Sequence, residues 1–512
     1  MGYKFLPSST LALVLLVAVA LRFWAIGWGA PYLYHPDEHL VLHPALNIVR
    51  TGDVNPHWFQ YPSLLIYIQA GLVAAIEPLV HAPLTTDPMQ NHTGPWDVLP
   101  AQWPFALAGR CLVAGFAILG VYWMYRLGRA YTGTPVGLAA AFFLATAPLH
   151  NESSHFLTTD IPAATLLTAA LALSVETVQA PNLQRLLLSG CVAGLAAATK
   201  YTAGIAVLVP LALGFSFSFR RSLQGIVAIL GAAALGFLVA CPFAALDFPA
   251  FWSSVLQQRQ NYLGGYSAGP NWRWYAVYLY SLGLRPPLAV AGAIGMLAIA
   301  IRSLRHADRR RLNLTLVVAP VLYFVVVSSY PSRAERNLII LLPFLCLFAA
   351  DAVWHIAKAA RPRRGTGVLC ALLVVAIAAP GITACVQHDR ELTRPDTRTV
   401  ALRWIETHLP PGTRIAREEY TPQISGERYR VMYQWSLARL NYGWYLAVPI
   451  DYLVVSANVY SRALYPPYVA GPAGPRFYNF IFQKLPLAAE FNPGPEMSGP
   501  TIRIYTVPHG PQ

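Results

Sequence analysis

Residues 34–39 read Tyr-His-Pro-Asp-Glu-His and lie a few residues beyond the first long apolar run of the chain. That run, from Leu11 to Trp28, holds about 18 residues with one charge, Arg22, which is enough to cross a hydrocarbon core about 30 Å thick. An Asp-Glu pair flanked by histidines at the mouth of a membrane helix has two interpretations. It is either a functional site at the membrane surface or a solvated loop whose acids serve solubility.

The composition of the whole chain is that of a membrane protein. Of 512 residues, 55% are hydrophobic and 12% are charged, whereas soluble domains have about 25% charged residues. The formal net charge is +14, but the basic residues mostly occupy short loops between apolar runs, which argues against a nucleic-acid partner. The six cysteines lie within or beside apolar runs, so the sequence predicts neither a disulfide framework nor a cysteine metal site.

We expect about 11 membrane-spanning helices, three of them short. Their approximate ranges are 8–28, 105–126, 134–150, 160–179, 186–199, 201–219, 222–242, 286–303, 313–329, 338–357 and 366–385. With a cytoplasmic N-terminus, the inner loops carry the basic clusters at 302–311 and 358–364, as the positive-inside rule requires. The sequence therefore predicts a mainly α-helical, multi-pass membrane protein whose C-terminus lies outside the cytoplasm.

Three outer segments are too long to be plain turns, namely 29–104, 243–285 and 386–512. In the first, the apolar piece from Leu64 to Val80 is expected to lie in the membrane interface as an amphipathic helix. The last segment is mixed polar and charged, and it reads as a small soluble α/β domain. We expect a helix at 397–408 and strands near 414–416, 452–456 and 501–505, which divides the chain into a membrane domain, 1–385, and a soluble domain, 386–512.

Three acids at the expected outer ends of helices are candidate catalytic residues: Asp37, Glu38 and Asp160. Asp37 could act as a general base that takes a proton from an acceptor as a sugar carbon is attacked, and a carboxylate also suits an oxocarbenium-like transition state. Asp160 could orient the groups around Asp37. Its alternative role is that of a first-turn acid that stabilises a helix N-terminus.

Four cations are candidate ligands for an anionic group such as a lipid phosphate: Lys200, Arg259, Arg333 and Arg336. The last two matter most, because an outer turn rich in arginine violates the positive-inside bias. Each cation also has a plainer explanation. Arg333 or Arg336 could pair with Glu335, Lys200 could extend to the interface, and Arg259 could be an ordinary loop residue.

Histidines leave a further question open. His35, His39, His43 and His155 could bind a divalent metal together with the acids, but their spacing matches no fixed metal motif, so the sequence leaves the metal unknown.

The order and spacing of several motifs resemble one family. Residues 34–39, with Tyr61-Pro62-Ser63-Leu64-Leu65-Ile66-Tyr67, are similar to the first outer loop of the protein O-mannosyltransferase and aminoarabinose-transferase group, glycosyltransferases of the GT-C fold (family 39 type). The tail resembles the periplasmic domain of bacterial members, and the double proline usual in the second motif is replaced by Tyr61-Pro62-Ser63. Further matches are Ala108-Gly109-Arg110, 155–162 and 198–202.

The resemblance implies an enzyme of the cell inner membrane. It would move a sugar from a polyprenyl-phosphate donor to an acceptor on the outer, periplasmic face, with inversion at the anomeric carbon. The resemblance makes Asp37 the base and makes Lys200, Arg333 and Arg336 the phosphate ligands. Protein, lipid and glycan acceptors all stay open. The substrate-binding residues expected around the site are His35, His39, Tyr61, His155 and Tyr201.

Two other functions are weighed against the transferase. A transporter or flippase of a lipid-linked anion would place charges near the bilayer midplane and often shows an internal repeat, and neither is seen in this sequence. A non-catalytic envelope assembly protein would use its tail to bind a partner, and Asp37 would then be replaceable.

Overall fold

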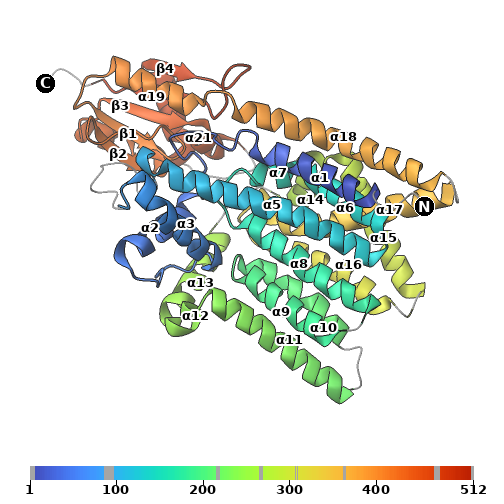
Figure 1. The fold of residues 1–512 in the computed structure, drawn as a ribbon. Helices are drawn as coiled ribbons and strands as arrows, with labels where there is room; N and C mark the ends of the chain where they lie inside the picture. Colours follow the sequence, from blue (N-terminus) through green and yellow to red (C-terminus); the bar gives the residue numbers. More distant parts are fainter. Residues whose placement is uncertain are drawn as a thin grey trace.

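The computed structural model describes residues 6–85, 97–180, 182–214, 219–264, 269–305, 307, 309–360, 365–465 and 473–508. In this part of the chain, helices dominate and one small sheet lies near the C-terminus (Figure 1). The mainly α-helical fold class with a C-terminal α/β unit is therefore confirmed.

Seven helices within the described residues are long and apolar enough to cross a membrane. Five shorter apolar helices accompany them, so the expected number of about 11 spans stays a prediction. The seven segments are Pro100–Tyr131, Asp160–Val178, Leu223–Ala240, Pro286–Arg305, Arg310–Ser329, Glu335–Ala360 and Thr366–Leu392; the shorter ones are Ser8–Phe23, Leu64–Val80, Thr134–Ala145, Leu183–Ala197 and Tyr201–Gly214.

The helical elements follow one another with short connections. They are α1 (Leu6–Phe23), α2 (His39–Thr51), α3 (Leu64–Val80), η1 (Pro100–Gln102), α5 (Trp103–Tyr131), α6 (Thr134–Ala145), α7 (Pro148–Ser153), α8 (Asp160–Gln179), α9 (Leu183–Ala197), η2 (Tyr201–Val207), α10 (Leu208–Gly214), α11 (Phe219–Ala240), α12 (Phe243–Leu246), α13 (Phe248–Leu263), α14 (Asn271–Tyr278), η3 (Leu279–Gly283), α15 (Pro286–Arg305), α16 (Arg310–Ser329), η4 (Glu335–Leu341), α17 (Leu342–Ala360) and α18 (Thr366–Leu392).

Small residues allow the apolar helices to pack closely. α9 and α11 approach so nearly that a Cβ at Gly194 would lie 2.0 Å from the Ala233 carbonyl oxygen, and a Cβ at Gly236 would lie 2.2 Å from that of Cys191. Close backbone approach through small residues is typical of helices that associate in lipid, where no hydrophobic driving force operates between them.

The outer segments gather at one end of the helix bundle. α2, α3, α12 and α13 lie at the same end as the C-terminal sheet, whereas the N-terminus lies towards the opposite end (Figure 1). The piece from Leu64 to Val80 is helical and packs on α2 and α5. Its expected place in the membrane interface stays a prediction.

Two expected boundaries shift in the structure. The first helix ends at Phe23, and residues 24–30 form turns. α18 continues to Leu392, seven residues beyond the expected end of the membrane domain, because the polar segment 386–392 continues the helix towards the C-terminal domain.

The C-terminal domain is a five-stranded sheet with helices on both faces. The strands β1 (Arg414–Glu418), β2 (Arg430–Gln434), β3 (Tyr452–Ser456), β4 (Leu487–Phe491) and β5 (Ile502–Thr506) have the order β2-β1-β3-β5-β4. The first three are parallel, and β5 is antiparallel to β3 and β4. α19 (Thr397–His408) packs on one face; α21 (Ala457–Leu464) and α22 (Ala473–Lys484) pack on the other. The expected helix and three strands are confirmed. The sequence reading missed β2, β4, η5 (Leu437–Arg439), α20 (Tyr442–Ala447), α21 and α22.

This domain docks on the loop that follows α1. The Tyr34 hydroxyl lies 2.9 Å from Thr399 Oγ1, and Arg398 Nη1 donates to the Tyr34 carbonyl oxygen at 3.0 Å. Gln423 Nε2 donates to the Leu33 carbonyl oxygen at 3.2 Å. The C-terminal domain thus helps to fix the loop that carries Asp37.

Candidate functional site

The centre of the candidate site is an ion pair between Asp37 and Arg336. Asp37 lies in the loop between α1 and α2, and Arg336 lies in η4, between α16 and α17. The two side chains are 14% and 34% exposed, so both are within reach of a ligand. His35 supports the loop, because its Nδ1 accepts the Asp37 backbone N–H at 3.2 Å and its ring stacks on Phe156 with centroids 4.4 Å apart.

Glu38, the next residue, points into the protein. Arg110 Nε donates to Glu38 Oε1 and Arg110 Nη2 donates to Oε2, each at 2.7 Å, and the Leu157 backbone N–H donates to Oε1 at 2.9 Å. Arg110 Nη1 also donates to the carbonyl oxygens of Trp28 at 2.6 Å and Ile26 at 3.1 Å. Both charged side chains are 0% exposed.

The expectation that Glu38 is itself catalytic does not fit this geometry. Both of its oxygens are occupied by donors of the protein, and burial keeps the carboxylate away from any substrate. Its contacts instead tie α5 to the loop before Asp37, which is a positioning role. The sequence offered one signal for this, since Arg110 is a charge inside an apolar helix and such charges need a partner.

Asp160 and Lys200 form a second buried pair, with Lys200 Nζ 2.5 Å from Asp160 Oδ1. Nζ also donates to Asn337 Oδ1 at 3.2 Å, and the Tyr323 hydroxyl donates to the Asn337 carbonyl oxygen at 2.7 Å. Lys200 is 6% exposed. As an open phosphate ligand Lys200 does not fit, and Asp160 serves Lys200 rather than Asp37. Together they anchor η4 next to Arg336.

The two other candidate cations differ in how they are held. Arg333 Nε donates to Asn271 Oδ1 at 2.6 Å, its Nη2 donates to the Gly269 carbonyl oxygen at 2.8 Å, and its guanidinium lies 5.6 Å from the centre of the Trp274 ring. Arg259 is exposed on α13. The structure therefore places Arg333 and Arg336 on one turn and Arg259 on a neighbouring outer helix.

The expected tyrosines line the base of the same outer region. The Tyr201 hydroxyl donates to the Phe59 carbonyl oxygen at 2.7 Å, and the Tyr61 ring lies edge-on to Trp58 with centroids 5.6 Å apart. Burial and the nearby charge of Asp160 raise the pKa of Tyr61. Both tyrosines hold the segment 58–61 against the helix bundle.

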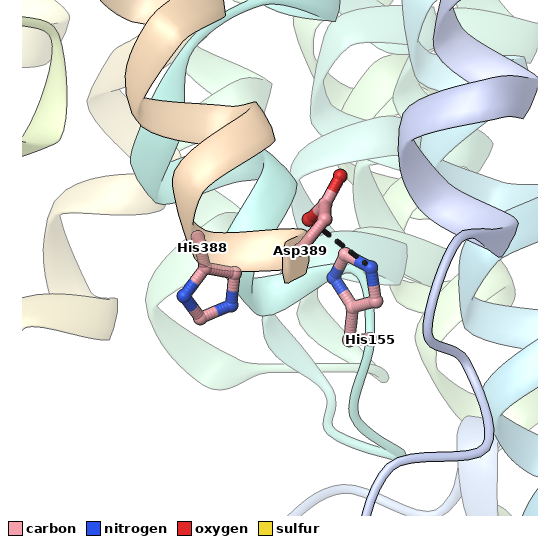
Figure 2. A group of neighbouring side chains, drawn as sticks. All are labelled: His155, His388 and Asp389. Carbon is pink, nitrogen blue, oxygen red and sulfur yellow. Dashed lines mark ion pairs between the residues drawn. The ribbon is translucent and has the colours of Figure 1, made fainter. Parts of the chain in front are cut away.

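The four histidines of the possible metal site are not brought together. The rings of His39 and His43 lie 5.7 Å apart, and burial lowers the pKa of His39 to about 3 and that of His43 to about 4, so both are neutral at pH 7. His155 instead lies beside His388 and Asp389 of α18 (Figure 2), the one group of three metal-ligating side chains found among the described residues.

That group fits a hydrogen-bonded histidine better than a metal. His155 Nδ1 lies 2.9 Å from the Asn151 carbonyl oxygen, and Nε2 lies 2.9 Å from the Trp24 carbonyl oxygen and 3.6 Å from Asp389 Oδ1. Neither ring nitrogen of His155 is therefore free to ligate a cation. Burial lowers the pKa of His155, and the two carbonyl oxygens oppose that shift. His155 ties the loop after α1 to α7 and α18.

These contacts give the site a fixed frame and a polar mouth. The loop that carries Asp37 is held by Glu38, Arg110 and His155, and the turn that carries Arg336 is held by Lys200. A carboxylate that can accept a proton and a guanidinium that can bind an anion thus face each other at the outer end of the bundle.

Comparison with known proteins gives one family and several folds. Residues 106–245 match the model of the dolichyl-phosphate-mannose-protein mannosyltransferase family. Among curated proteins, none matches the chain.

Solved structures resemble nearly the whole chain. The oligosaccharyltransferase of Archaeoglobus fulgidus, in its apo form, has a TM-score of 0.56 at 13% identity, covering 92% of this chain and 72% of that one. ArnT from Cupriavidus metallidurans bound to undecaprenyl phosphate has a TM-score of 0.53 at 16% identity, covering 100% and 99%. The same archaeal enzyme with an inhibitory peptide and a dolichol-phosphate scores 0.54 at 12% identity, covering 90% and 71%. The chain therefore has the fold of the GT-C glycosyltransferases, with a mannosyltransferase family match over residues 106–245.

Proposed function

We propose that this protein is a membrane glycosyltransferase that moves a sugar from a polyprenyl-phosphate donor to an acceptor on the outer face of the cell inner membrane. The observation that carries the proposal is the Asp37–Arg336 pair at the outer end of the bundle, which joins a base and an anion ligand in one partly exposed site. The family match and the lipid phosphates in the titles of two structural relatives support the choice of donor.

The reaction is a single displacement. An acceptor hydroxyl or amine attacks the anomeric carbon, its proton passes to an Asp37 carboxylate oxygen, and the bond from the anomeric carbon to the phosphate oxygen breaks. The electron pair of that bond leaves with the lipid phosphate, whose growing charge Arg336 stabilises. Attack opposite to the leaving group inverts the configuration.

Donor binding would release Asp37 from its ion pair. The phosphate competes for the Arg336 guanidinium, so the carboxylate becomes free to act as the base only when donor is present. Arg333 and Arg259 stand at the same outer end and can extend the anion site along the lipid headgroup. Lys200 and Asp160 take no direct part but hold Asn337 beside Arg336.

The frame around Asp37 supports catalysis by positioning. Holding two reactants in the attacking geometry can supply about 7 kcal/mol or more of a barrier in ideal cases. A donor confined to the leaflet already has restricted motion, so the enzyme needs mainly a placed base and a phosphate ligand. No divalent metal is required by these roles, and the histidines near the site are engaged with backbone or with one another.

The test uses full-length protein reconstituted with membrane-derived lipid-linked sugars. Asp37→Asn should abolish transfer while the protein still inserts and still copurifies with polyprenyl phosphate by mass spectrometry. Asp53→Asn is the matched control, because Asp53 is an outer-loop acid whose side chain is 53% exposed and bonded to His57.

Three results separate the competing functions. Transfer lost only in Asp37→Asn supports the transferase. Normal transfer by Asp37→Asn removes Asp37 from the mechanism. Donor carried across vesicles without any transfer would favour a flippase, and only bulk phospholipid bound to both proteins would favour an assembly role.

A further inference from the structure

Three parallel strands of the C-terminal domain end at one edge of its sheet. β1 lies between β2 and β3, and the three strands stop at Glu418, Gln434 and Ser456. In α/β domains, ligands bind outside the carboxyl ends of such strands, where the connections diverge to the two faces. The edge formed by these strand ends is therefore the expected ligand side of this domain.

Aromatic rings and guanidinium groups gather at this edge. The Arg462 guanidinium of α21 lies 5.2 Å from the centre of the Tyr420 ring and 5.9 Å from that of Trp435, and Arg439 lies 5.7 Å from Trp435. Arg462 Nη2 donates to the Tyr420 hydroxyl at 3.3 Å. These four residues are named here the strand-end cluster.

Two features of the strand-end cluster are those of a binding surface. Trp435 is 40% exposed, although a large aromatic side chain is normally covered, and Arg439 is exposed beside it. Tyr420 has φ of 59°, a left-handed conformation that a tyrosine rarely adopts. Backbone strain of this kind collects at functional sites and persists only where the surrounding structure enforces it.

The same edge faces the membrane site. Arg417 of β1 forms an ion pair with Asp97, which precedes α5, and Tyr420 interacts electrostatically with Arg336. A molecule held by the strand-end cluster would therefore approach the Asp37–Arg336 pair from the side of the C-terminal domain.

The acids of the edge do not cancel the arginines of the cluster. Glu418 is buried, which raises its pKa to about 8, so it is mostly uncharged at pH 7. Glu419 accepts the Tyr433 hydroxyl and lies near Arg417. The positive charge of Arg439 and Arg462 is thus directed at what lies outside the edge.

We propose that the strand-end cluster binds the acceptor and that the acceptor is an acidic glycan. The aromatic rings offer flat faces for the apolar side of sugar rings, and the guanidinium forks match carboxylate or phosphate groups. This inference rests on the proposed transferase function, because only a transferase needs an acceptor beside Asp37.

The experiment measures binding to the full chain in detergent by saturation-transfer NMR and calorimetry, without donor. The probes are tetragalacturonate against its methyl ester, and maltose 1-phosphate against maltose. The variants are Arg439→Gln with Arg462→Gln, and Trp435→Leu. Arg503→Gln is the matched control, because Arg503 also lies over aromatic rings, those of Tyr460 and Phe482, but on β5.

Each acidic probe should bind at least about tenfold more tightly than its neutral partner, and the double arginine variant should lose that difference, as expected for charge-assisted hydrogen bonds. Trp435→Leu should weaken acidic and neutral probes alike, and Arg503→Gln should bind as the wild type does. Preference for only the carboxylate or only the phosphate probe would name the acidic group.

Equal binding of acidic and neutral probes, an equal loss in Arg503→Gln, or no binding at all would overturn the proposal. Melting temperatures of the variants separate a lost site from a lost fold. The result is independent of turnover, because Asp37→Asn should bind the acidic probes normally. If Asp37→Asn still transfers sugar while the probes bind, the proposed mechanism fails and the glycan site stands.

Discussion

The buried pair of Glu38 and Arg110 offers a sharp test of what positions the site. Glu38→Gln keeps the size of the side chain but leaves the Arg110 charge uncompensated at 0% exposure. Breaking a buried pair by removing one partner costs about 3–5 kcal/mol. Arg110→Met should cost a similar amount and, in addition, leaves the Ile26 and Trp28 carbonyl oxygens without their donor, at about 1–3 kcal/mol for each buried group.

The double variant, Glu38→Leu with Arg110→Met, removes both charges together. Replacing a buried ion pair by apolar side chains is often nearly neutral, so the double variant should be more stable than the sum of the single losses by about 3 kcal/mol or more. The assay is unfolding of the detergent-solubilised protein with increasing denaturing detergent, alongside sugar transfer with membrane-derived donor.

Transfer should follow stability in this series if Glu38 acts by holding the loop before Asp37. Additive losses of the two single variants would refute the coupling inferred from the distances. A double variant that regains stability but has no measurable transfer would refute the positioning role and restore Glu38 as a residue that acts on the substrate.

Three more outcomes are expected. Lys200→Met should destabilise the protein by about 3–5 kcal/mol because it leaves Asp160 buried and unpaired, and unchanged unfolding in denaturing detergent would contradict that. Arg336→Gln should weaken copurification with polyprenyl phosphate about tenfold or more, measured by mass spectrometry beside Arg430→Gln, an exposed control on β2; equal lipid content in the two would move the anion site elsewhere. Glu418 has a pKa of about 8 in the folded protein against 4.5 ordinarily, so the folded state binds the extra proton and its contribution to stability is lost as pH rises from about 4.5 to 8. Glu418→Gln should flatten the pH dependence of thermal unfolding in that window, and an unchanged profile would assign the dependence to other groups.

Local patterns in the sequence were sufficient for much of the fold. Apolar runs located the long helices, because a chain in lipid must satisfy its backbone hydrogen bonds internally. In the tail, the alternation around Tyr452–Ser456 and the apolar spacing of Thr397–His408 predicted a strand and a helix that the structure contains. The short strands β2 and β4 were missed, since their half-exposed residues give weak alternation.

The candidate site was predicted as a set of residues, but not as a set of contacts. Charges at the ends of apolar runs are costly and therefore informative, which is how Asp37, Asp160, Lys200 and Arg336 could be singled out. Nothing in the sequence distinguishes Asp37 from Glu38, because direction along a turn is set by the loop conformation. The structure turns one outward to Arg336 and the other inward to Arg110.

The sequence by itself determined the membrane character, the arrangement of basic loops and the presence of a polar α/β tail, because hydropathy and charge act locally along the chain. Only the tertiary structure decided which charges meet. Asp37 pairs with Arg336, Lys200 with Asp160, and Glu38 with Arg110, each across a long stretch of chain. Such pairings depend on how helices pack and on which groups lose water together, and these quantities exist only once the chain has folded.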